Sequence, residues 1–314
     1  MDNQENTNTD SVGHRSSTRL GYLFAFISAA LFGSISTVAK PALSASIHPL
    51  LLSSMVYLVA AATMTPIAHK NSSNGGSSAS NPLFLKRKNY LYIFGIAILG
   101  AVIAPTLYFI GLERTTASHA AILSTAEIVF TVVIATLIFR EKIKPIGYIG
   151  VILVLSGVII ITTTQNLQDL GSLTKINYGD LLIVSSTLFW GIDNNISKII
   201  SHKISAAKVV QIKSFIGGSL LMAIVIVFGI EININLTQIP NIILLGAGGF
   251  AISIFFFLHS LRRIGTVRTI VIFSTSSIFG AIFSIAFLRE QLQISQLMAI
   301  PVMIFGVYLV NRKK

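Results

Sequence analysis

Apolar segments long enough to cross a lipid bilayer recur along the whole chain. Each contains about 18–24 residues, and an α-helix of that length, rising 1.5 Å per residue, spans a hydrocarbon layer of about 30 Å. This pattern predicts an all-α membrane protein with ten transmembrane helices. The predicted spans are residues 20–39, 47–68, 90–111, 116–139, 146–163, 179–198, 207–230, 241–260, 267–288 and 293–311.

The composition agrees with this pattern. Hydrophobic residues make up 53% of the 314 residues and charged residues only 11%, whereas about a quarter of a typical soluble domain is charged. A soluble chain of this size needs more polar residues to cover its surface, which excludes a cytosolic enzyme and a disordered chain. The chain has no cysteine, so disulfides, a thiolate nucleophile and a cysteine metal site are excluded as well.

Polar segments precede the first predicted span and follow the last one. Residues 1–19 are polar and irregular, and we predict a cytoplasmic tail there; residues 312–314 form a short basic tail. The apolar run after residue 19 is longer than the hydrophobic region of a signal peptide. It is therefore expected to remain in the membrane as the first span.

The distribution of basic residues predicts the orientation of the chain. There are 23 Lys and Arg residues against 11 Asp and Glu, a formal net charge of +12. With the N-terminus in the cytoplasm, 19 of these cations fall on the cytoplasmic side, where membrane proteins concentrate them. We therefore expect a multi-pass cell-membrane protein with both termini cytoplasmic and no nucleic-acid partner. The cations left outside are Lys40, Arg114, Lys175 and Arg289.

The two halves of the sequence resemble each other. A polar connector at 164–178 separates residues 20–163 from 179–311, and each half holds five predicted spans. Equivalent positions lie 158 residues apart up to Lys40 and 149 residues apart from Leu112 onward. An insertion in the first half, the flexible Gly/Ser-rich linker at 71–81, accounts for the difference. The paired positions are Gly21, Gly33 and Lys40 with Gly179, Gly191 and Lys198; Leu112, Arg114 and Phe130 with Leu261, Arg263 and Phe279; Arg140-Glu141 with Arg289-Glu290; and Gly157 with Gly306.

An odd number of spans in each half means that the second half enters the membrane from the opposite side. Two inverted five-helix repeats are typical of secondary transporters, in which the substrate binds near the midplane between the halves. This organisation favours transport of a small organic solute by alternating access.

Four motifs carry a resemblance to a known family. They are Leu31-Phe32-Gly33 with Lys40, Gly111-Leu112-Glu113-Arg114-Thr115-Thr116-Ala117, Phe139-Arg140-Glu141-Lys142 with Gly147 and Gly157, and the echo Ser260-Leu261-Arg262-Arg263-Ile264-Gly265 with Leu288-Arg289-Glu290-Gln291. With these motifs the chain resembles the drug/metabolite transporter superfamily, in its EamA-type branch, from about residue 20 to 311. The resemblance implies transport of small organic metabolites such as amino acids, nucleotide sugars or drugs, and a central cavity lined by spans one, three, four, six, eight and nine.

The fourth span departs from the pattern of this family. Its members often carry a proline after the glutamate in the middle of that span, but here Ile128 follows Glu127. The equivalent stretch 274–277 of the ninth span also lacks proline. A proline kink is therefore not expected in either span.

Glu127 has the strongest functional claim of any single residue, because it lies near the centre of the fourth span. A carboxylate at that depth costs several kcal/mol unless it faces a cavity, a partner or a proton. Ser124 and Thr131 lie on the same helix face. We expect these three residues to bind substrate or couple transport to protons; a protonated glutamate hydrogen-bonded for packing is the alternative.

A polar run interrupts the sixth span at Trp190, Asp193, Asn194 and Asn195. Asp193 pairs with Lys213 of the seventh span in one interpretation. In the other, Lys213 extends to the cytoplasm and Asp193 joins the asparagines in a polar cavity. Hydrogen bonds between helices are a third, purely structural explanation.

The remaining candidates are less specific. Lys40 and Lys198 either extend to the membrane surface or attract anions at a cavity mouth. Tyr108 and Trp190 with Phe255–Phe257 either wall an apolar substrate site or simply pack. His119 and His259 lack a second ligand three or four residues away, so neither a metal site nor a cofactor is predicted. Arg140-Glu141 and Arg289-Glu290 are expected to be charge pairs at helix ends.

Several functions remain open on the sequence alone. A nucleotide-sugar or lipid translocator of the same superfamily is the first alternative, and a non-transporting membrane receptor or scaffold is the second. A membrane-embedded enzyme would need clustered catalytic acids or histidines, and the sequence has only scattered ones. The expected partners are a small-molecule substrate and the lipid bilayer, with a homodimer left open.

Overall fold

The computed structural model describes residues 5–73, 87–139, 144–163, 177–201 and 203–311. These residues form helices and short connections, with no strand among them. In chain order the helices are α1 (Glu5–Ser44), α2 (Pro49–Ser73), α3 (Arg87–Ile98), η3 (Leu99–Ile103), α4 (Ala104–Glu113), α5 (Ala117–Leu123), α6 (Ala126–Phe139), α7 (Pro145–Thr163), α8 (Tyr178–Ser201), α9 (Ala206–Val227), η5 (Leu236–Gln238), α10 (Ile239–Ile243), η6 (Leu244–Ile252), α11 (Ser253–Phe273), α12 (Ser276–Leu288) and α13 (Ile294–Asn311).

Eight helical stretches in the described part of the chain are long and apolar enough to span a bilayer. The predicted sixth and tenth spans are helical but fall outside this group. α8 has 24 residues, and its Asp180, Asp193 and Lys198 make it more polar than the others. The apolar part of α13, Ile294–Val310, is shorter. The structure is thus an all-helical integral membrane protein.

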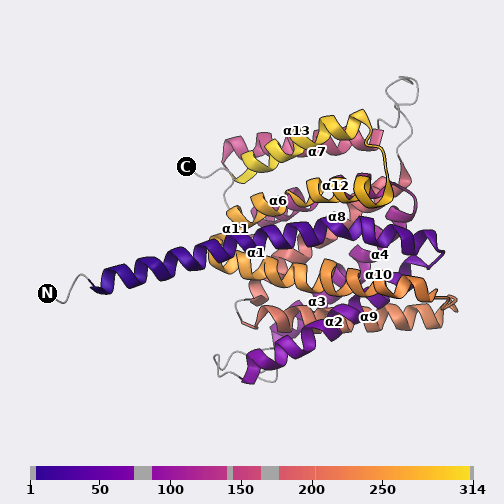
Figure 1. Cartoon of the computed structure of the whole chain (residues 1–314), viewed down its shortest axis with the longest axis horizontal. Coiled ribbons are helices and arrows are strands. Elements are labelled where there is room, and N and C mark those ends of the chain that lie inside the picture. Colours follow the sequence, from indigo (N-terminus) through magenta and orange to yellow (C-terminus); the bar gives the residue numbers. More distant parts are fainter. Residues whose placement is uncertain (1–4, 74–86, 140–143, 164–176, 202, 312–314) are drawn as a thin grey trace.

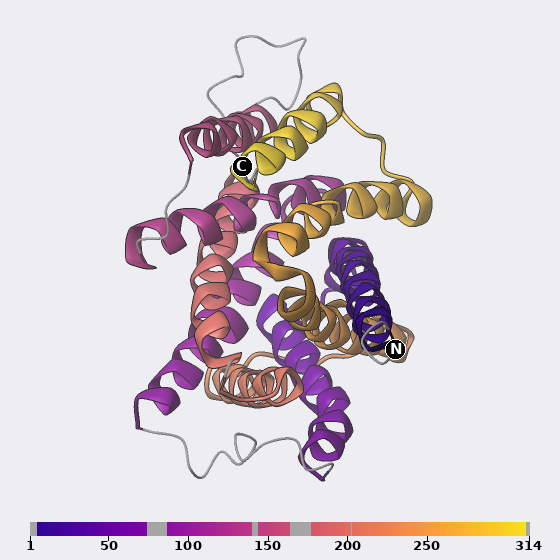
Figure 2. The same cartoon turned by 90° about the vertical axis from the view of Figure 1, so that its left-hand side faces the viewer.

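The helices lie side by side as a bundle (Figure 1). α7 and α13 form a pair along one edge, α1 runs through the middle, and α2, α3 and α9 lie along the opposite edge (Figure 1). α1 starts and α13 finishes toward the same side of the bundle (Figure 1). Seen along the bundle, the helices surround a central region to which α1, α6, α8 and α11 all come close (Figure 2).

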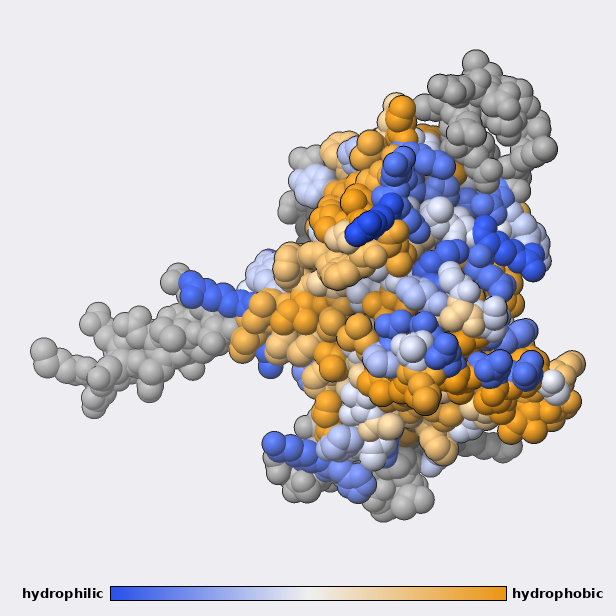
Figure 3. Space-filling model, turned by 45° about the vertical axis from the view of Figure 1, so that its right-hand side comes forward, coloured by the Kyte–Doolittle hydropathy of each residue, from blue (hydrophilic) through white to orange (hydrophobic). Residues whose placement is uncertain are grey.

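The surface of the bundle is largely apolar. Figure 3 shows hydrophobic residues over the sides of the helices, whereas hydrophilic residues gather at the end that faces the viewer. Large apolar side chains such as Leu137, Ile152 and Phe287 are exposed on the surface of the described helices. Such a surface suits contact with lipid rather than water.

The first helix begins before the first predicted span. α1 starts at Glu5 and continues without interruption into that span, so the described part of the polar N-terminal segment is helical. Its N-terminal part projects beyond the rest of the bundle (Figure 1). α2 likewise continues to Ser73, so residues 71–73 of the predicted linker are helical. The rest of that linker, residues 164–176 of the connector, and Arg140 and Glu141 lie outside the described residues.

The fourth and ninth spans are each broken near the middle, although neither contains a proline there. α5 ends at Leu123 and α6 begins at Ala126, while α11 ends at Phe273 and α12 begins at Ser276. Serine and threonine hydroxyls donate to backbone carbonyls at both breaks; for example, Ser124 Oγ lies 2.7 Å from the Ala120 oxygen. Such side-chain bonds compete with the helical pattern and bend the chain. Both spans are therefore broken without a proline.

The third and eighth spans each contain a π-helical segment, at Leu99–Ile103 and Leu244–Ile252. Such segments leave backbone carbonyls available for other partners and are frequent at functional sites. The carbonyl of Gly100 uses this freedom, accepting hydrogen bonds from the Tyr57 hydroxyl at 2.7 Å and from Trp190 Nε1 at 3.2 Å. The hydropathy pattern of the sequence predicts neither segment.

Candidate functional site

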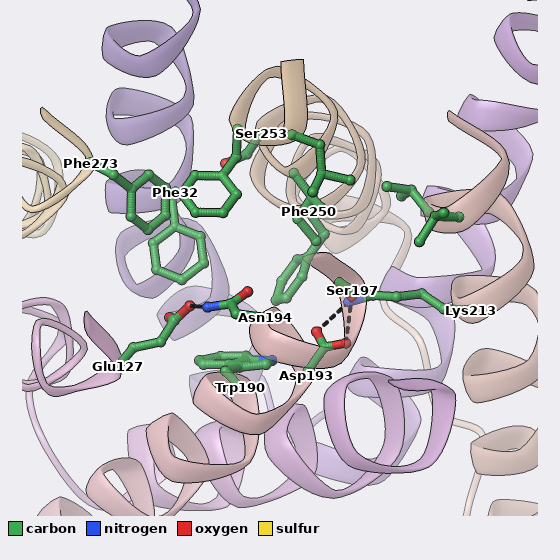
Figure 4. Close-up of a pocket in the computed structure, with 15 residues that line it drawn as sticks. Phe32, Glu127, Trp190, Asp193, Asn194, Ser197, Lys213, Phe250, Ser253 and Phe273 are labelled. Atoms are coloured by element: carbon green, nitrogen blue, oxygen red, sulfur yellow. Dashed lines mark hydrogen bonds and ion pairs between the residues drawn. The ribbon is translucent and has the colours of Figure 1, made fainter. Parts of the chain in front are cut away.

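A cavity lies in the interior of the bundle. The space between its atoms amounts to about 590 Å³, its open mouth included. Helices from both halves of the chain line it, and charged, amide and aromatic groups face one another across it (Figure 4). The lining residues are Phe32, Glu127, Trp190, Asp193, Asn194, Ser197, Val209, Val210, Lys213, Phe250, Ser253, Ile254, Phe257, Leu258 and Phe273.

Glu127 is buried at the wall of this cavity, with 6% of its surface exposed. Its Oε1 accepts a hydrogen bond from Asn194 Nδ2 at 2.7 Å. Among the described residues, no group donates to or accepts from Oε2. The carboxyl group therefore has one hydrogen-bonded oxygen and one buried oxygen without a partner among the described residues.

The break in the fourth span explains how Glu127 reaches the cavity. Glu127 lies in the first turn of α6, where unpaired N–H groups and the helix dipole favour a negative charge. Thr131, one turn later, donates to the Glu127 carbonyl at 2.7 Å, and its hydroxyl lies 3.3 Å from Asn194 Nδ2. Thr131 thus helps to orient Asn194 toward the carboxyl group.

Asp193 and Lys213 form a buried ion pair on the other side of the cavity (Figure 4). Ser197 Oγ donates to Asp193 Oδ1 at 3.1 Å, and both charged side chains are about 4% exposed. The structure thus contains the pair that one interpretation of the sequence gave, and Asp193 and Asn194 also line the cavity. Because the two charges compensate each other, the pair adds no net charge to the cavity.

Aromatic rings close the space between Glu127 and the ion pair. Phe32 lies with its ring centroid 6.0 Å from Trp190 and 4.9 Å from Phe273. Phe250, from the π-helical segment η6, lies 6.4 Å from Trp190. Phe257 completes this side, 4.8 Å from Phe273. Of the phenylalanine run singled out in the sequence, Phe257 alone is among the residues described as lining the cavity.

Trp190 is held in a fixed position by two contacts. Its indole N–H donates to the Gly100 carbonyl at 3.2 Å, and Tyr108 packs against its ring with centroids 5.3 Å apart. Tyr108 itself is not part of the lining; it supports Trp190 from behind. Gly100 also leaves room for Asp193, because a Cβ atom there would overlap the Asp193 carboxylate.

Four other predicted site residues lie away from the cavity lining. Ser124 donates to the Ala120 carbonyl at the helix break. Asn195 donates to the carbonyls of Thr131 and Gly191, at 2.9 and 2.8 Å, and so joins α8 to α6. Lys198 is in the last turn of α8, outside the lining.

Lys40 is the fourth of these residues, and it binds backbone carbonyls. Its Nζ donates to the carbonyls of Leu112 at 2.7 Å, Thr115 at 2.6 Å and Glu113 at 3.3 Å. This ammonium group therefore caps the C-terminus of α4, where the helix dipole favours a positive charge. Of the two interpretations of Lys40, the anion-attracting group at a cavity mouth finds no support in this geometry.

A second polar cluster lies at the end of the bundle where α1 and α4 end and α5 and α8 begin, called here the Glu290 end. Asp180 is fully buried; it accepts from Thr115 Oγ1 at 2.6 Å and lies 3.5 Å from His119 Nδ1. Glu290, which we expected to be in a helix-end charge pair, instead binds the N-terminus of α5. Sequence reasoning missed Asp180 because it lies at the start of a span, where an acidic residue is unremarkable.

Comparisons with known proteins agree with this architecture. A family model, described as the EamA-like transporter family, matches residues 19–163 and residues 177–312. An uncharacterised transporter from Methanothermobacter thermautotrophicus is 29% identical over 296 residues, which cover 92% of this chain and 85% of that protein. Another from Clostridium kluyveri is 24% identical over 91% of each chain. A solved crystal structure has a similar fold, with a TM-score of 0.66 at 14% identity over 92% of this chain and 96% of that one. The chain therefore belongs to the EamA-like transporter family.

Proposed function

We propose that this protein is a secondary transporter that moves a small organic solute across the cell membrane by alternating access. The observation that carries this proposal is the cavity between helices of the two halves, whose wall includes Glu127 with one buried carboxyl oxygen that has no partner among the described residues. The uncharacterised relatives are named as transporters, which supports the same conclusion. Two inverted repeats of five helices, 20–163 and 179–311, form the proposed framework.

Close helix contacts support the inverted repeat. Gly33 of α1 lies against α12 at Phe279, and Gly191 of α8 lies against α6 at Phe130. Gly191 is the repeat equivalent of Gly33, and Phe130 is the equivalent of Phe279. The first half therefore contacts the second in the way that the second contacts the first, as expected for a two-fold relation between halves.

In two more pairs of contacts, equivalent residues of the two halves again contact equivalent partners. Gly157 lies against Met303, and its equivalent Gly306 lies against Val154, which is the equivalent of Met303. Gly179 approaches Arg114, and the equivalent Gly21 approaches Arg263. With an odd number of spans in each half, this two-fold axis would lie in the membrane plane.

The position of the cavity supports a state that is open toward one end. Along α8, which begins at Tyr178, the lining residues run from Trp190 to Ser197. Those of α9 run from Val209 to Lys213, within two turns of its start. The cavity thus lies on the side away from the Glu290 end. With both termini in the cytoplasm, as the basic residues predict, this state faces inward.

Flux measurements test the transport proposal directly. The purified protein is first screened against amino acids, amines and nucleotide sugars for compounds that raise its melting temperature, because a ligand of the folded state stabilises it. Radiolabelled compounds from that screen are then tested for counterflow into proteoliposomes. Counterflow above protein-free liposomes is expected. Ligands that bind without any counterflow would instead indicate a receptor or scaffold.

A further inference from the structure

We infer that the cavity binds an organic ammonium ion, a primary or secondary amine whose N–H group donates to Glu127 Oε2 while an apolar or aromatic body packs among the rings of Phe32, Trp190 and Phe250. That such an amine is carried across the membrane rests on the proposed function. Its binding does not, and can be measured separately.

The charges of the lining favour a cation. Asp193 and Lys213 compensate each other, and Asn194, which contacts Glu127, is neutral. Within the described part of the chain, no ion pair involves Glu127. The carboxylate is thus the one uncompensated charge among the lining residues, and a buried charge needs a counter-charge to remain ionised.

One carboxyl oxygen of Glu127 lacks a hydrogen-bond donor among the described residues. Oε1 is satisfied by Asn194, whereas Oε2 is buried and without a partner in the described structure. Leaving a buried acceptor unpaired is unfavourable, and a donor supplied by a ligand recovers that loss. An ammonium group meets both needs at once, because it brings N–H donors and a positive charge.

The rings beside Glu127 suit the same ligand. Phe32 and Phe273 lie 4.9 Å apart between ring centroids, and Trp190 lies 6.0 Å from Phe32. The faces of aromatic rings attract ammonium groups, and indole does so most strongly. The apolar body of an amine would replace water against these rings.

Anions and zwitterions fit this site less well. A carboxylate placed in the cavity would meet the uncompensated Glu127. The cation of the lining, Lys213, already binds Asp193 and is not free to balance it. Like-charge repulsion should therefore select amines over amino acids of the same size.

Trp190 provides a direct measure of binding. It is the only tryptophan of the chain and it lines the cavity, so its fluorescence reports on this site alone. The probes are phenethylamine, the neutral 2-phenylethanol and the zwitterion phenylalanine, titrated into the purified full-length protein. We expect a saturable change with phenethylamine, and an affinity for the other two that is lower by about 10-fold or more.

Two variants separate the role of Glu127 from general effects. Glu127→Gln is nearly isosteric and cannot ionise, and should weaken phenethylamine about 10- to 100-fold while changing 2-phenylethanol little. Asp180→Asn removes another buried carboxylate, one that does not line the cavity, and should leave the affinity unchanged. Melting curves show that each variant is folded.

The outcomes distinguish the two proposals. Saturable amine binding without counterflow of any solute would keep the amine site and overturn transport. Counterflow of another solute with no effect of phenethylamine on Trp190, or equal amine affinity in wild type and Glu127→Gln, would overturn the amine site. A variant that fails to fold is replaced by Glu127→Asp, which keeps the charge and should retain amine binding within a few-fold.

Discussion

Glu290 holds the start of α5 from the opposite half of the protein: its Oε2 accepts the backbone N–H of Ser118 at 2.9 Å. Its Oε1 accepts the neighbouring N–H of Ala117 at 2.8 Å. Unpaired N–H groups at a helix N-terminus attract a carboxylate. Gln296, also from the second half, donates to Ser118 Oγ at 3.0 Å. The two halves are thus joined at the Glu290 end, away from the cavity.

We expect Glu290→Gln to loosen this end of the bundle. Gln keeps the shape but loses the negative charge and one acceptor, which removes a charge-assisted bond of about 1.5 kcal/mol. Because the chain has no cysteine, Ser36→Cys provides a unique thiol in α1, in a position that is 1% exposed. Its reaction with an impermeant thiol reagent should become about 10-fold faster in the Glu290→Gln background.

Glu231→Gln is the matched control for this experiment. Glu231 is an exposed carboxylate in the segment after α9, at the same end of the bundle. It should leave the labelling rate unchanged. Equal rates in wild type and Glu290→Gln would show that the contact between Glu290 and α5 does not keep this end closed.

The ion pair of Asp193 and Lys213 should show strong energetic coupling. Replacing one partner, as in Asp193→Asn or Lys213→Met, leaves the other charge buried and should destabilise the protein by about 3–5 kcal/mol. The double variant removes both charges and should lose less than the sum of the two single variants. The free energy of unfolding is measured in mixed detergent micelles for the wild type, the two single variants and the double variant. If the losses of the two single variants simply add up in the double variant, the two side chains are not energetically coupled.

The close approach of Gly100 to Asp193 gives a third prediction. In Gly100→Ala the added Cβ would overlap the Asp193 carboxylate, so the ion pair and the adjacent Trp190 must shift. We expect a loss of about 1–3 kcal/mol in stability together with altered Trp190 fluorescence.

Gly95→Ala controls for the change of residue type. Gly95 precedes the π-helical segment in the same span, and the nearest side-chain atom to an added Cβ, Ile196 Cδ1, is 4.0 Å away. This variant should be neutral or slightly stabilising, since alanine favours helix more than glycine. Similar losses in both variants would mean that crowding of Asp193 is not the cause.

The last prediction concerns coupling of transport to protons through Glu127. The charged groups that face it across the cavity are Asp193 and Lys213, which pair with each other. Falling pH protonates Glu127 and releases a bound cation, so wild-type flux should respond to a pH gradient. In Glu127→Gln this response should disappear, while exchange without a gradient should be recovered at substrate concentrations about 10- to 100-fold higher, which offset the weaker binding.

Substrate flux into proteoliposomes with and without a pH gradient measures this effect. Glu231→Gln, which changes an exposed carboxylate, should respond as the wild type does. If Glu127→Gln keeps the full response to the gradient, Glu127 does not carry the proton, and the region of Asp193 becomes the next candidate.

The sequence by itself determined the class of protein and singled out charged residues that line the candidate site. Membrane spans can be read from hydropathy because every apolar residue in a span lowers its energy locally, whatever its neighbours are. Glu127, Asp193 and Lys213 stood out for the same reason, since a charge within a span is costly wherever it lies. The equivalent glycines of the two halves likewise indicated two related units.

The tertiary structure decided which of these residues meet. Asn194 reaches Glu127, Lys40 caps α4 and Glu290 caps α5. The residues in each of these contacts lie 67 to 173 positions apart in the sequence, and no local pattern encodes such neighbours. The helix breaks at Ser124 and Ser274 and the π-helical segments arise from hydrogen-bond choices that are nearly balanced within a single helix. Tertiary packing decides which of these hydrogen bonds form. The Gly100 carbonyl, for example, can leave the α-helical pattern because Trp190 and Tyr57 are placed to donate to it.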